Sequence, residues 1–302
     1  MIPTAISSSS TIRTRASPRD RLASTRRRNH AAPSALTALH FLQETDGSVA
    51  DGLTGKNKVR KRIKAAISML DLEDYAVAAT ERDRLAGEAS SDLAKLFYAH
   101  KGRLIHKWLH YLDIYDRHFS PYRNTPVKML EIGVSQGGSL ELWREYFGKD
   151  ATLFGIDIDP ECATRVTAPS QVRIGSQDDP KFLQSVIDEM GPPDIILDDG
   201  SHIGRHQRAS FDALFPLLRE GGLYLIEDLH TAYSFVRWEG GYRRKSTGIE
   251  LVKDMIDDMH SWYHHKKVRT ASRNQIGAIH IYDSIAVIEK RQVTQPRYIE
   301  LQ

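Results

Sequence analysis

Five short apolar segments alternate with helical segments from residue 127 onward, and this alternation is the strongest constraint on the fold of the chain. The apolar runs read VKMLEI, TLFGID, QVRI, DIIL and LYLI. Between them lie segments such as SLELWREYF and PKFLQSVIDEM, in which apolar residues recur at helical spacing. Strands that alternate with helices of about 10–15 residues predict βαβ units and therefore a parallel sheet.

Two further apolar runs, GAIHIY and IAVIEK, follow a helix predicted at about 247–262. Only Asp283 and Ser284 separate the two runs. Such a short connection cannot make a parallel crossover, so these runs predict an antiparallel hairpin. The predicted fold is therefore α/β, with a doubly wound, Rossmann-like sheet of five parallel strands and a C-terminal antiparallel hairpin.

The first 43 residues differ from the rest of the chain in composition. Residues 1–43 are rich in Ser, Thr, Arg and Pro, and they contain seven arginines and one acidic residue, Asp20. They lack an apolar core pattern, so we expect a disordered tail. No apolar stretch follows the first basic residues, which argues against a secretory signal. An organellar transit peptide has a similar Arg-rich, acid-poor composition, so an organelle is the alternative to a cytoplasmic location.

A helical region is predicted between this tail and the sheet, over residues 44–120. Apolar residues at helical spacing predict helices over about 55–87 and about 92–119, and the second helix is expected to end or turn near Ile114. We expect this region to serve as a lid or in oligomerisation. The domain that carries the sheet is predicted at 121–302.

Composition excludes several classes of protein. The chain has one cysteine, Cys162, which rules out an intramolecular disulfide and a cysteine-rich zinc site and favours a reducing, cytoplasmic compartment. The net charge is +3, but the basic tail supplies that excess. The rest of the chain is slightly acidic and does not predict nucleic-acid binding. No apolar run approaches the length of about 18 residues that predicts a membrane span. The sequence leaves open whether the protein forms a homo-oligomer.

A glycine-rich turn follows the first predicted strand, in LEIGVSQGGSLELW. Glu131, Gly133, Ser135 and Gly137 lie between this strand and the next helix, where a ligand can approach the backbone closely. The turn lacks the second glycine of the dinucleotide motif G-x-G-x-x-G, and Glu131 would repel a pyrophosphate but suits a cation. The pattern E-x-G-x-x-x-G resembles the S-adenosylmethionine site of class I methyltransferases.

The next two strand ends complete the predicted cofactor site. The second strand ends in FGIDID, and an acidic residue at its tip can accept hydrogen bonds from both hydroxyls of a ribose. We assign this role to Asp157, with Asp159 as the alternative. The third strand is followed by GSQDD, in which Ser176 and Gln177 are predicted to meet the adenine. Asp179 in the same run predicts a helix N-cap.

Acidic residues end the fourth and fifth predicted strands, in DIILDDGSH and LYLIEDLHTAY. Asp199, Glu227 and Asp228 are therefore expected to converge at the carboxyl edge of the sheet, where open α/β sheets bind ligands. Three neighbouring carboxylates repel one another strongly without a cation. Their hard oxygen atoms favour Mg²⁺, with Mn²⁺ or Ca²⁺ as alternatives. His202 follows Asp199 closely enough to face the same pocket.

Five motifs occur in this order along the chain: LEIGVSQGGSL, GIDID, GSQDD, DDGSH and IEDLHTAY. Together they resemble the metal-dependent sugar O-methyltransferases of the macrocin and mycinamicin type over about residues 97–290. The resemblance implies that S-adenosylmethionine is the cofactor and that a hydroxyl of a sugar or natural-product glycoside is the acceptor. It implies a Mg²⁺ ion held by Asp199, Glu227 and Asp228. It also implies that His202 is the general base that takes the proton of the hydroxyl.

Other interpretations of these motifs stay open. A cephalosporin hydroxylase-like enzyme or a catechol-type methyltransferase would use the same fold and metal site. A partner subunit that binds S-adenosylmethionine without catalysing a reaction is a further alternative. The intact carboxylates and His202 argue against the non-catalytic role, and the glycine spacing disfavours an NAD oxidoreductase. Asp198, beside the first of these carboxylates, is grouped with the cofactor residues and is expected to support the site or the strand.

Overall fold

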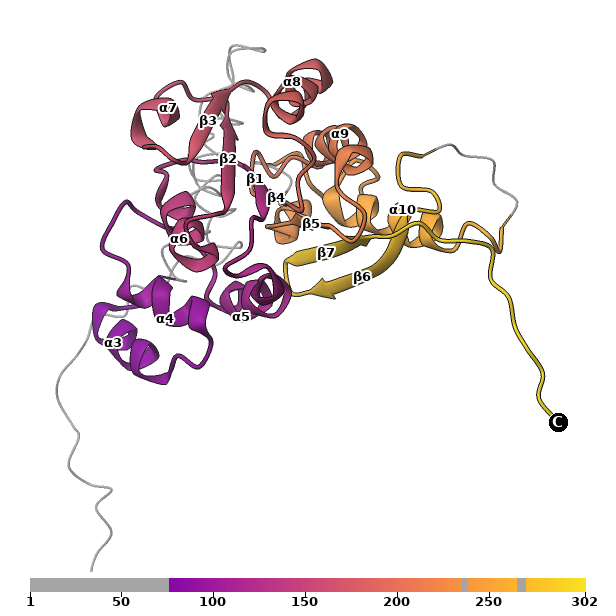
Figure 1. The fold of residues 1–302 in the computed structure, drawn as a ribbon, viewed down its shortest axis with the longest axis horizontal. Coiled ribbons are helices and arrows are strands. Elements are labelled where there is room, and N and C mark those ends of the chain that lie inside the picture. Colours follow the sequence, from indigo (N-terminus) through magenta and orange to yellow (C-terminus); the bar gives the residue numbers. More distant parts are fainter. Residues whose placement is uncertain (1–75, 235–237, 265–269) are drawn as a thin grey trace, which may run out of the picture. The chain divides into compact units, whose positions relative to one another are not determined.

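The computed structural model describes residues 76–234, 238–264 and 270–302, and it is built on a seven-stranded sheet with the order β3-β2-β1-β4-β5-β7-β6 (Figure 1). The first five strands are parallel, as predicted. The last two form the predicted hairpin, in which β7 pairs antiparallel with β5. The strands are β1 (Lys128–Ile132), β2 (Thr152–Asp157), β3 (Gln171–Ile174), β4 (Ile195–Asp198), β5 (Leu223–Ile226), β6 (Ile276–Tyr282) and β7 (Ile285–Lys290).

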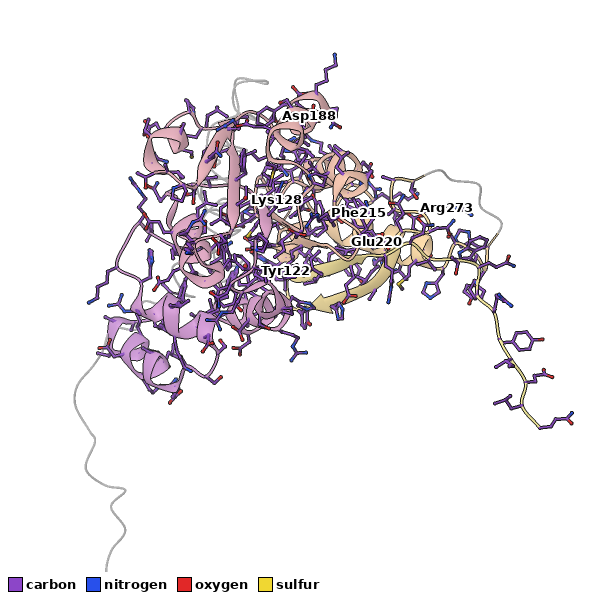
Figure 2. The ribbon with its side chains drawn as sticks, in the orientation of Figure 1. Tyr122, Lys128, Asp188, Phe215, Glu220 and Arg273 are labelled. Carbon is purple, nitrogen blue, oxygen red and sulfur yellow. The ribbon has the colours of Figure 1, made fainter. Side chains whose placement is uncertain are left out.

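Two apolar cores lie on opposite faces of the sheet, which confirms the doubly wound arrangement. Successive side chains of a strand point to opposite faces, so Met129 of β1 belongs to one core and Leu130 to the other. Side chains fill the space on both faces, and Figure 2 labels one residue packed on each side, Tyr122 and Phe215. The first core includes α5 (Leu109–Phe119) and α6 (Gly138–Phe147), and the second includes α8 (Pro180–Met190), α9 (Gly204–Leu214) and α10 (Gly248–Met259).

The single helix expected over about 92–119 is wrong. The chain forms α4 (Asp92–Ala99) and then α5, and residues 100–108, here called the crossing segment, join the two without a helix. The expected end near Ile114 is also wrong, because Ile114 is buried within α5. Both helices bury apolar side chains in the first core, so their combined spacing imitates one continuous stripe.

The tail predicted over 1–43 lies outside the described residues, as does most of the helix expected over about 55–87. Helix α3 (Ala79–Glu88) covers the end of that helix. The remaining short elements are α7 (Cys162–Arg165), η2 (Ser120–Tyr122), η3 (Phe215–Leu217) and η4 (Leu229–Tyr233). Within the described ranges, no helix has both the length and the apolar character needed to cross a membrane.

Gly138, the first residue of α6, allows the crossing segment to lie directly against this helix. A Cβ atom at Gly138 would meet the carbonyl oxygen of Arg103 at 2.4 Å and that of Leu104 at 2.5 Å. The backbone amide of Arg103 donates a hydrogen bond to Glu141 Oε2 at 2.9 Å. Contacts with α6 therefore fix the path of the crossing segment, whose later residues reach the candidate site.

Replacing Gly138 with alanine should destabilise the protein by about 1–3 kcal/mol, as forced overpacking does, despite the better helix propensity of alanine. Thermal unfolding measures the difference. Gly87 in α3 is a matched control, because a Cβ atom there meets no other atom within 4 Å. The Gly87→Ala protein should unfold at the same temperature as the wild type or higher. Equal melting temperatures for both variants would show that the crossing segment accommodates the added methyl group.

Candidate active site

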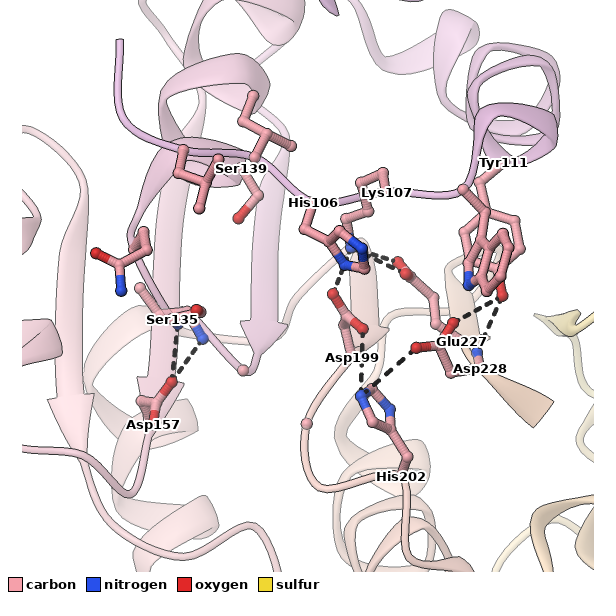
Figure 3. Close-up of a pocket in the computed structure, with 17 residues that line it drawn as sticks. His106, Lys107, Tyr111, Ser135, Ser139, Asp157, Asp199, His202, Glu227 and Asp228 are labelled. Atoms are coloured by element: carbon pink, nitrogen blue, oxygen red, sulfur yellow. Dashed lines mark hydrogen bonds and ion pairs between the residues drawn. The ribbon is translucent and has the colours of Figure 1, made fainter. Parts of the chain in front are cut away.

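The strand ends identified from the sequence meet in one cavity at the carboxyl edge of the sheet (Figure 3). The cavity has a volume of about 410 Å³. The loop after β1 and the tips of β2, β4 and β5 form part of its wall, and residues 104–108 of the crossing segment form another part. Open α/β sheets bind their ligands at this edge, so the cavity is the candidate active site.

The glycine turn after β1 brings the backbone close to this cavity. Gly133 has a φ angle of +91°, and a Cβ atom there would lie 2.2 Å from the carbonyl oxygen of Asp199. Glycine is therefore required where the loops after β1 and β4 touch. Gly137, with a φ angle of +84°, is the N-cap residue of α6, and Ser135 lines the cavity.

Asp157, at the tip of β2, supports the glycine turn and also lines the cavity. Its Oδ2 atom accepts hydrogen bonds from the amides of Val134 and Ser135 at 2.9 and 3.0 Å, and its Oδ1 atom accepts one from Asp159 at 2.9 Å. Burial alone would raise the pKa of Asp157, but these hydrogen bonds lower it below its usual value. Asp157 therefore stays a carboxylate, with lone pairs left for a further donor such as a ribose hydroxyl.

A smaller cavity of about 190 Å³ contains the two residues predicted to meet the adenine. Ser176 and Gln177 line it together with the partly apolar tip of β2, including Ile158. Gly133 and Asp157 line both cavities. The two cavities therefore adjoin each other at the tips of β1 and β2.

Gln177 and Asp198 form a buried pair beneath this region. The amide nitrogen Nε2 of Gln177 donates to Asp198 Oδ1 at 3.1 Å, while Gln177 Oε1 accepts from the amide of Ser201 at 2.7 Å. Asp198 is fully buried, accepts a hydrogen bond from the Ser210 hydroxyl at 2.6 Å, and has a pKa raised by burial. Neither cavity has Asp198 in its lining, and its hydrogen bonds join the end of β4 to Gln177 and to α9.

Glu131 is fully buried behind the wall of the larger cavity. It accepts hydrogen bonds from Ser139 Oγ at 2.9 Å and from Trp143 Nε1 at 3.3 Å. Burial raises the pKa of Glu131 to about 7, against the opposing effect of Lys107. Ser139 does line the cavity, so Glu131 influences this space through its charge and through the serine hydroxyl.

The predicted carboxylates and His202 lie together at the tips of β4 and β5 (Figure 3). Asp199, His202 and Asp228 offer ligand atoms that all lie within 4.8 Å of one another. His202 Nε2 is 3.5 Å from Asp228 Oδ2 and 4.0 Å from Asp199 Oδ1. The other ring nitrogen, Nδ1, is buried and has no hydrogen-bond partner among the described residues. We call Asp199, Asp228 and the adjacent His202 the acidic cluster; Glu227 is not part of it.

Glu227 lies beside the acidic cluster and shares with Asp199 a lysine that the sequence analysis did not single out. Lys107 Nζ donates to Asp199 Oδ2 at 2.5 Å and to the two oxygen atoms of Glu227 at 2.9 and 3.0 Å. The side chains of Lys107 and Glu227 are only 4% and 1% exposed. Burial would lower the pKa of Lys107, but the two carboxylates outweigh it and raise that pKa above its usual value. Burial and the nearby Asp199 raise the pKa of Glu227.

Two tyrosines of α5 also reach these carboxylates. Tyr115 donates its hydroxyl hydrogen to Glu227 Oε1 at 2.5 Å, and Tyr111 donates to Asp228 Oδ1 at 2.9 Å. The sequence carries one signal for them: Lys107, Tyr111 and Tyr115 are spaced four residues apart and place polar groups on an otherwise apolar stripe. That signal does not reveal which partners the three side chains have, because those partners are far away in the sequence.

The fold and the site define a class of protein. A doubly wound sheet, a glycine turn after β1 and an acidic residue at the tip of β2 are all present. Residues 130–229 match the family model described as a methyltransferase domain. This part of the chain is therefore a methyltransferase domain, and the predicted class is confirmed.

The relatives of the chain are O-methyltransferases. The chain is 36% identical over 236 residues to the 8-demethyl-8-(2-methoxy-alpha-L-rhamnosyl)-tetracenomycin-C 3'-O-methyltransferase of Streptomyces olivaceus. This match covers 72% of this chain and 58% of that protein. It is 37% identical over 243 residues to the demethylmacrocin O-methyltransferase of Streptomyces fradiae, which covers 72% of this chain and 59% of that protein. The matched part of the chain therefore spans less than two thirds of either relative.

A solved structure agrees with these relatives. The chain resembles the MycE methyltransferase from the mycinamycin biosynthetic pathway, determined in complex with Mg, SAH and mycinamycin VI, with a TM-score of 0.58 and 32% sequence identity. The match covers 72% of this chain and 63% of that one. The resemblance to the macrocin and mycinamicin type, first based on motifs, is thus confirmed by sequence and by fold.

Proposed function

We propose that the protein is an S-adenosylmethionine-dependent and Mg²⁺-dependent O-methyltransferase that acts on a hydroxyl of a sugar or natural-product glycoside. One observation carries this proposal: a single cavity is lined both by Asp157 with the glycine turn and by the acidic cluster. A methyl donor bound at the first part would face an acceptor hydroxyl at the second. The names of the relatives support the same reaction class.

The cofactor would extend across the two cavities that share Gly133 and Asp157. The Asp157 carboxylate would accept hydrogen bonds from the ribose hydroxyls, and Ser176 would lie beside the adenine. The positive charges of the methionine part would lower the raised pKa of Glu131, which lies just behind the wall, and the ionised Glu131 would in turn stabilise those charges. Gln177 and Asp198 would support the adenine end from beneath, in keeping with their buried hydrogen bond.

The donor set fits a divalent cation with a preference for oxygen ligands. Four carboxylates line the cavity, a fifth, Glu131, lies just behind its wall, and the Lys107 ammonium contacts two of the five directly. This excess of negative charge favours Mg²⁺ over an empty site. Asp199 and Asp228 would hold the ion, with Glu227 as the third carboxylate. When S-adenosylmethionine and the metal ion are both bound, the cofactor supplies an electrophilic methyl group and the metal lowers the pKa of the acceptor hydroxyl.

His202 would take the proton of the acceptor hydroxyl as the oxygen bonds to the methyl group and the sulfonium carbon–sulfur bond breaks. Its Nε2 atom lies 3.5–4.0 Å from the Asp228 and Asp199 carboxylates, which would orient the hydroxyl. General base help of this kind is worth about 10²–10⁴-fold in rate. The grouping of His202 with Asp199 and Asp228 favours a second role, as a ligand of the cation. The two roles predict different metal affinities for a histidine variant.

Calorimetry and a methyl-transfer assay test this function together. We expect S-adenosylhomocysteine to bind and NAD not to bind, because the turn lacks the dinucleotide glycine spacing. Methyl transfer from S-adenosylmethionine to a panel of glycosides should occur with Mg²⁺, stop in EDTA and return when Mg²⁺ is added. The matching aglycones without sugar are the control acceptors. Tight binding of NAD, or turnover that survives EDTA and long dialysis, would contradict the proposal.

Other parts of the proposed function rest on the sequence and stay predictions. These are the cytoplasmic location, the absence of nucleic-acid and membrane partners, a homo-oligomeric state, and the role of residues 44–120 as a lid or in oligomerisation. Helices α4 and α5 share the first core with the sheet, which supports a role of this region close to the active site.

A further inference from the structure

A lysine side chain lies among the carboxylates proposed to hold the metal ion. Lys107 Nζ is 2.5 Å from Asp199 Oδ2 and 2.9 Å from Glu227 Oε2, and its side chain is only 4% exposed (Figure 3). A buried ammonium between two carboxylates compensates charge that would otherwise be strongly unfavourable. Lys107 therefore shares two of the three carboxylates that are proposed to hold the metal.

The two cations cannot both use these oxygen atoms fully. A divalent ion bound by Asp199 and Glu227 would lie within a few ångströms of the ammonium, and like charges at that separation repel strongly in a buried site. The Lys107 side chain also fills space beside both carboxylates. Binding of the metal by all three carboxylates thus requires the ammonium to leave its present position.

The position of Lys107 links the metal site to the crossing segment. Residues 104–108 line the cavity, and the segment is tied to α6 by the Arg103 amide, which donates to Glu141, and by the close approach of Leu104 and Ile105 to Gly138. His100 Nε2 adds a contact to the carbonyl oxygen of Arg103 at 2.8 Å. At the other end, the ion pairs of Lys107 join the segment to the tips of β4 and β5, and the Trp108 ring contacts the His230 ring beyond β5.

We propose that Lys107 is an internal counter-ion that competes with the divalent cation for Asp199 and Glu227. Lys107 thereby sets the metal affinity of the site, and entry of the metal displaces the Lys107 ammonium from Asp199 and Glu227. The inference rests on the proposed function, because it assumes that the carboxylates bind a metal. The alternative arrangement, in which Lys107 stays and the acidic cluster alone binds the ion, is an outcome of the experiment below.

Mn²⁺ binding, measured by electron paramagnetic resonance on the full chain without substrate, tests the competition directly. Lys107→Met removes the ammonium but keeps most of the side-chain volume, so Asp199 and Glu227 repel each other until a cation binds. We expect this variant to bind Mn²⁺ at least about 10-fold more tightly than the wild type. Lys128→Met is the matched control, because Lys128 lies at the opposite end of β1 and donates to the carbonyl oxygen of Met190. Its Mn²⁺ affinity should equal that of the wild type.

A second measurement needs no variant and covers the case in which Lys107→Met folds poorly. The wild-type protein is treated briefly with an amine-acylating reagent, and modification of Lys107 is followed by mass spectrometry. The buried ammonium should react slowly in metal-free protein and several-fold faster with saturating Mg²⁺. Unchanged acylation would show that Lys107 stays in place when the metal binds.

The outcomes separate this inference from the proposed function. If wild-type protein binds Mn²⁺ and Lys107→Met binds it no more tightly, the competition is refuted and the metal site stands. If neither protein binds Mn²⁺, both the competition and the metal-dependent function are refuted. If Lys107→Met alone binds Mn²⁺, or binds it more tightly, the competition is supported.

Discussion

Replacing Asp199 with alanine should abolish metal binding and methyl transfer together. Asp199 belongs to the acidic cluster through Oδ1 and faces Lys107 through Oδ2. The substitution removes one anionic ligand, and it leaves the Lys107 ammonium with Glu227 alone. Both effects weaken the site for a divalent cation, so we expect Mn²⁺ affinity to fall by about 100-fold or more. Turnover should fall in parallel, because the acceptor hydroxyl then lacks the charge that lowers its pKa.

The measurements for Asp199→Ala are Mn²⁺ binding, S-adenosylhomocysteine binding and turnover at saturating Mg²⁺. Binding of S-adenosylhomocysteine should change little, because Asp157 and the glycine turn keep their contacts. Asp188→Asn is the control: Asp188 is exposed on α8, where it accepts a hydrogen bond from Gln184. That variant should match the wild type in all three assays. Wild-type Mn²⁺ affinity in Asp199→Ala would place the metal site elsewhere.

Replacing His202 should slow methyl transfer while the metal still binds, if the histidine is the general base. We expect turnover to fall by about 10²-fold or more in His202→Ala, because no other group takes the proton as well. S-adenosylhomocysteine and Mn²⁺ should bind as tightly as in the wild type. This variant thus fails in rate, whereas Asp199→Ala fails in binding.

A second His202 variant separates side-chain chemistry from backbone strain. The φ angle of His202 is +56°, a conformation that asparagine tolerates better than most residues. His202→Asn should therefore keep the loop and show the same loss of turnover as His202→Ala. A loss of Mn²⁺ affinity in both variants would instead make His202 a ligand of the cation. Turnover at the wild-type rate would make the residue structural.

Much of the fold and part of the site could be predicted from the sequence, because both depend on local patterns. The period of the apolar residues distinguishes strands from helices, and the two-residue gap at Asp283 and Ser284 requires a hairpin. The polarity of parallel strands then brings the residues after β1, β2, β4 and β5 to one edge. For this reason Asp157, Asp199, His202 and Asp228 could be placed near one another before their distances were known.

The sequence pattern was misleading where two elements share one core. The apolar residues of α4 and α5 both face the first core, so their spacing imitates a single helix and conceals the crossing segment. The same error conceals Lys107, since a lysine within a long helix is expected to be solvated. The path of the crossing segment is decided by contacts with Gly138 and Glu141 on α6, which no local pattern encodes.

By itself, the sequence determined the architecture of the protein and the edge at which its acidic residues gather. The tertiary structure alone decided how those acidic residues differ. Glu227 is almost fully buried and paired with Lys107 and Tyr115, which precede it by 120 and 112 residues, while Asp228 beside it is partly exposed and contacts His202. Adjacent residues in a chain carry the same local information, but burial and charge pairing depend on segments brought together only by folding. Both carboxylates line the cavity, but only folding pairs one of them with a buried ammonium and leaves the other partly exposed.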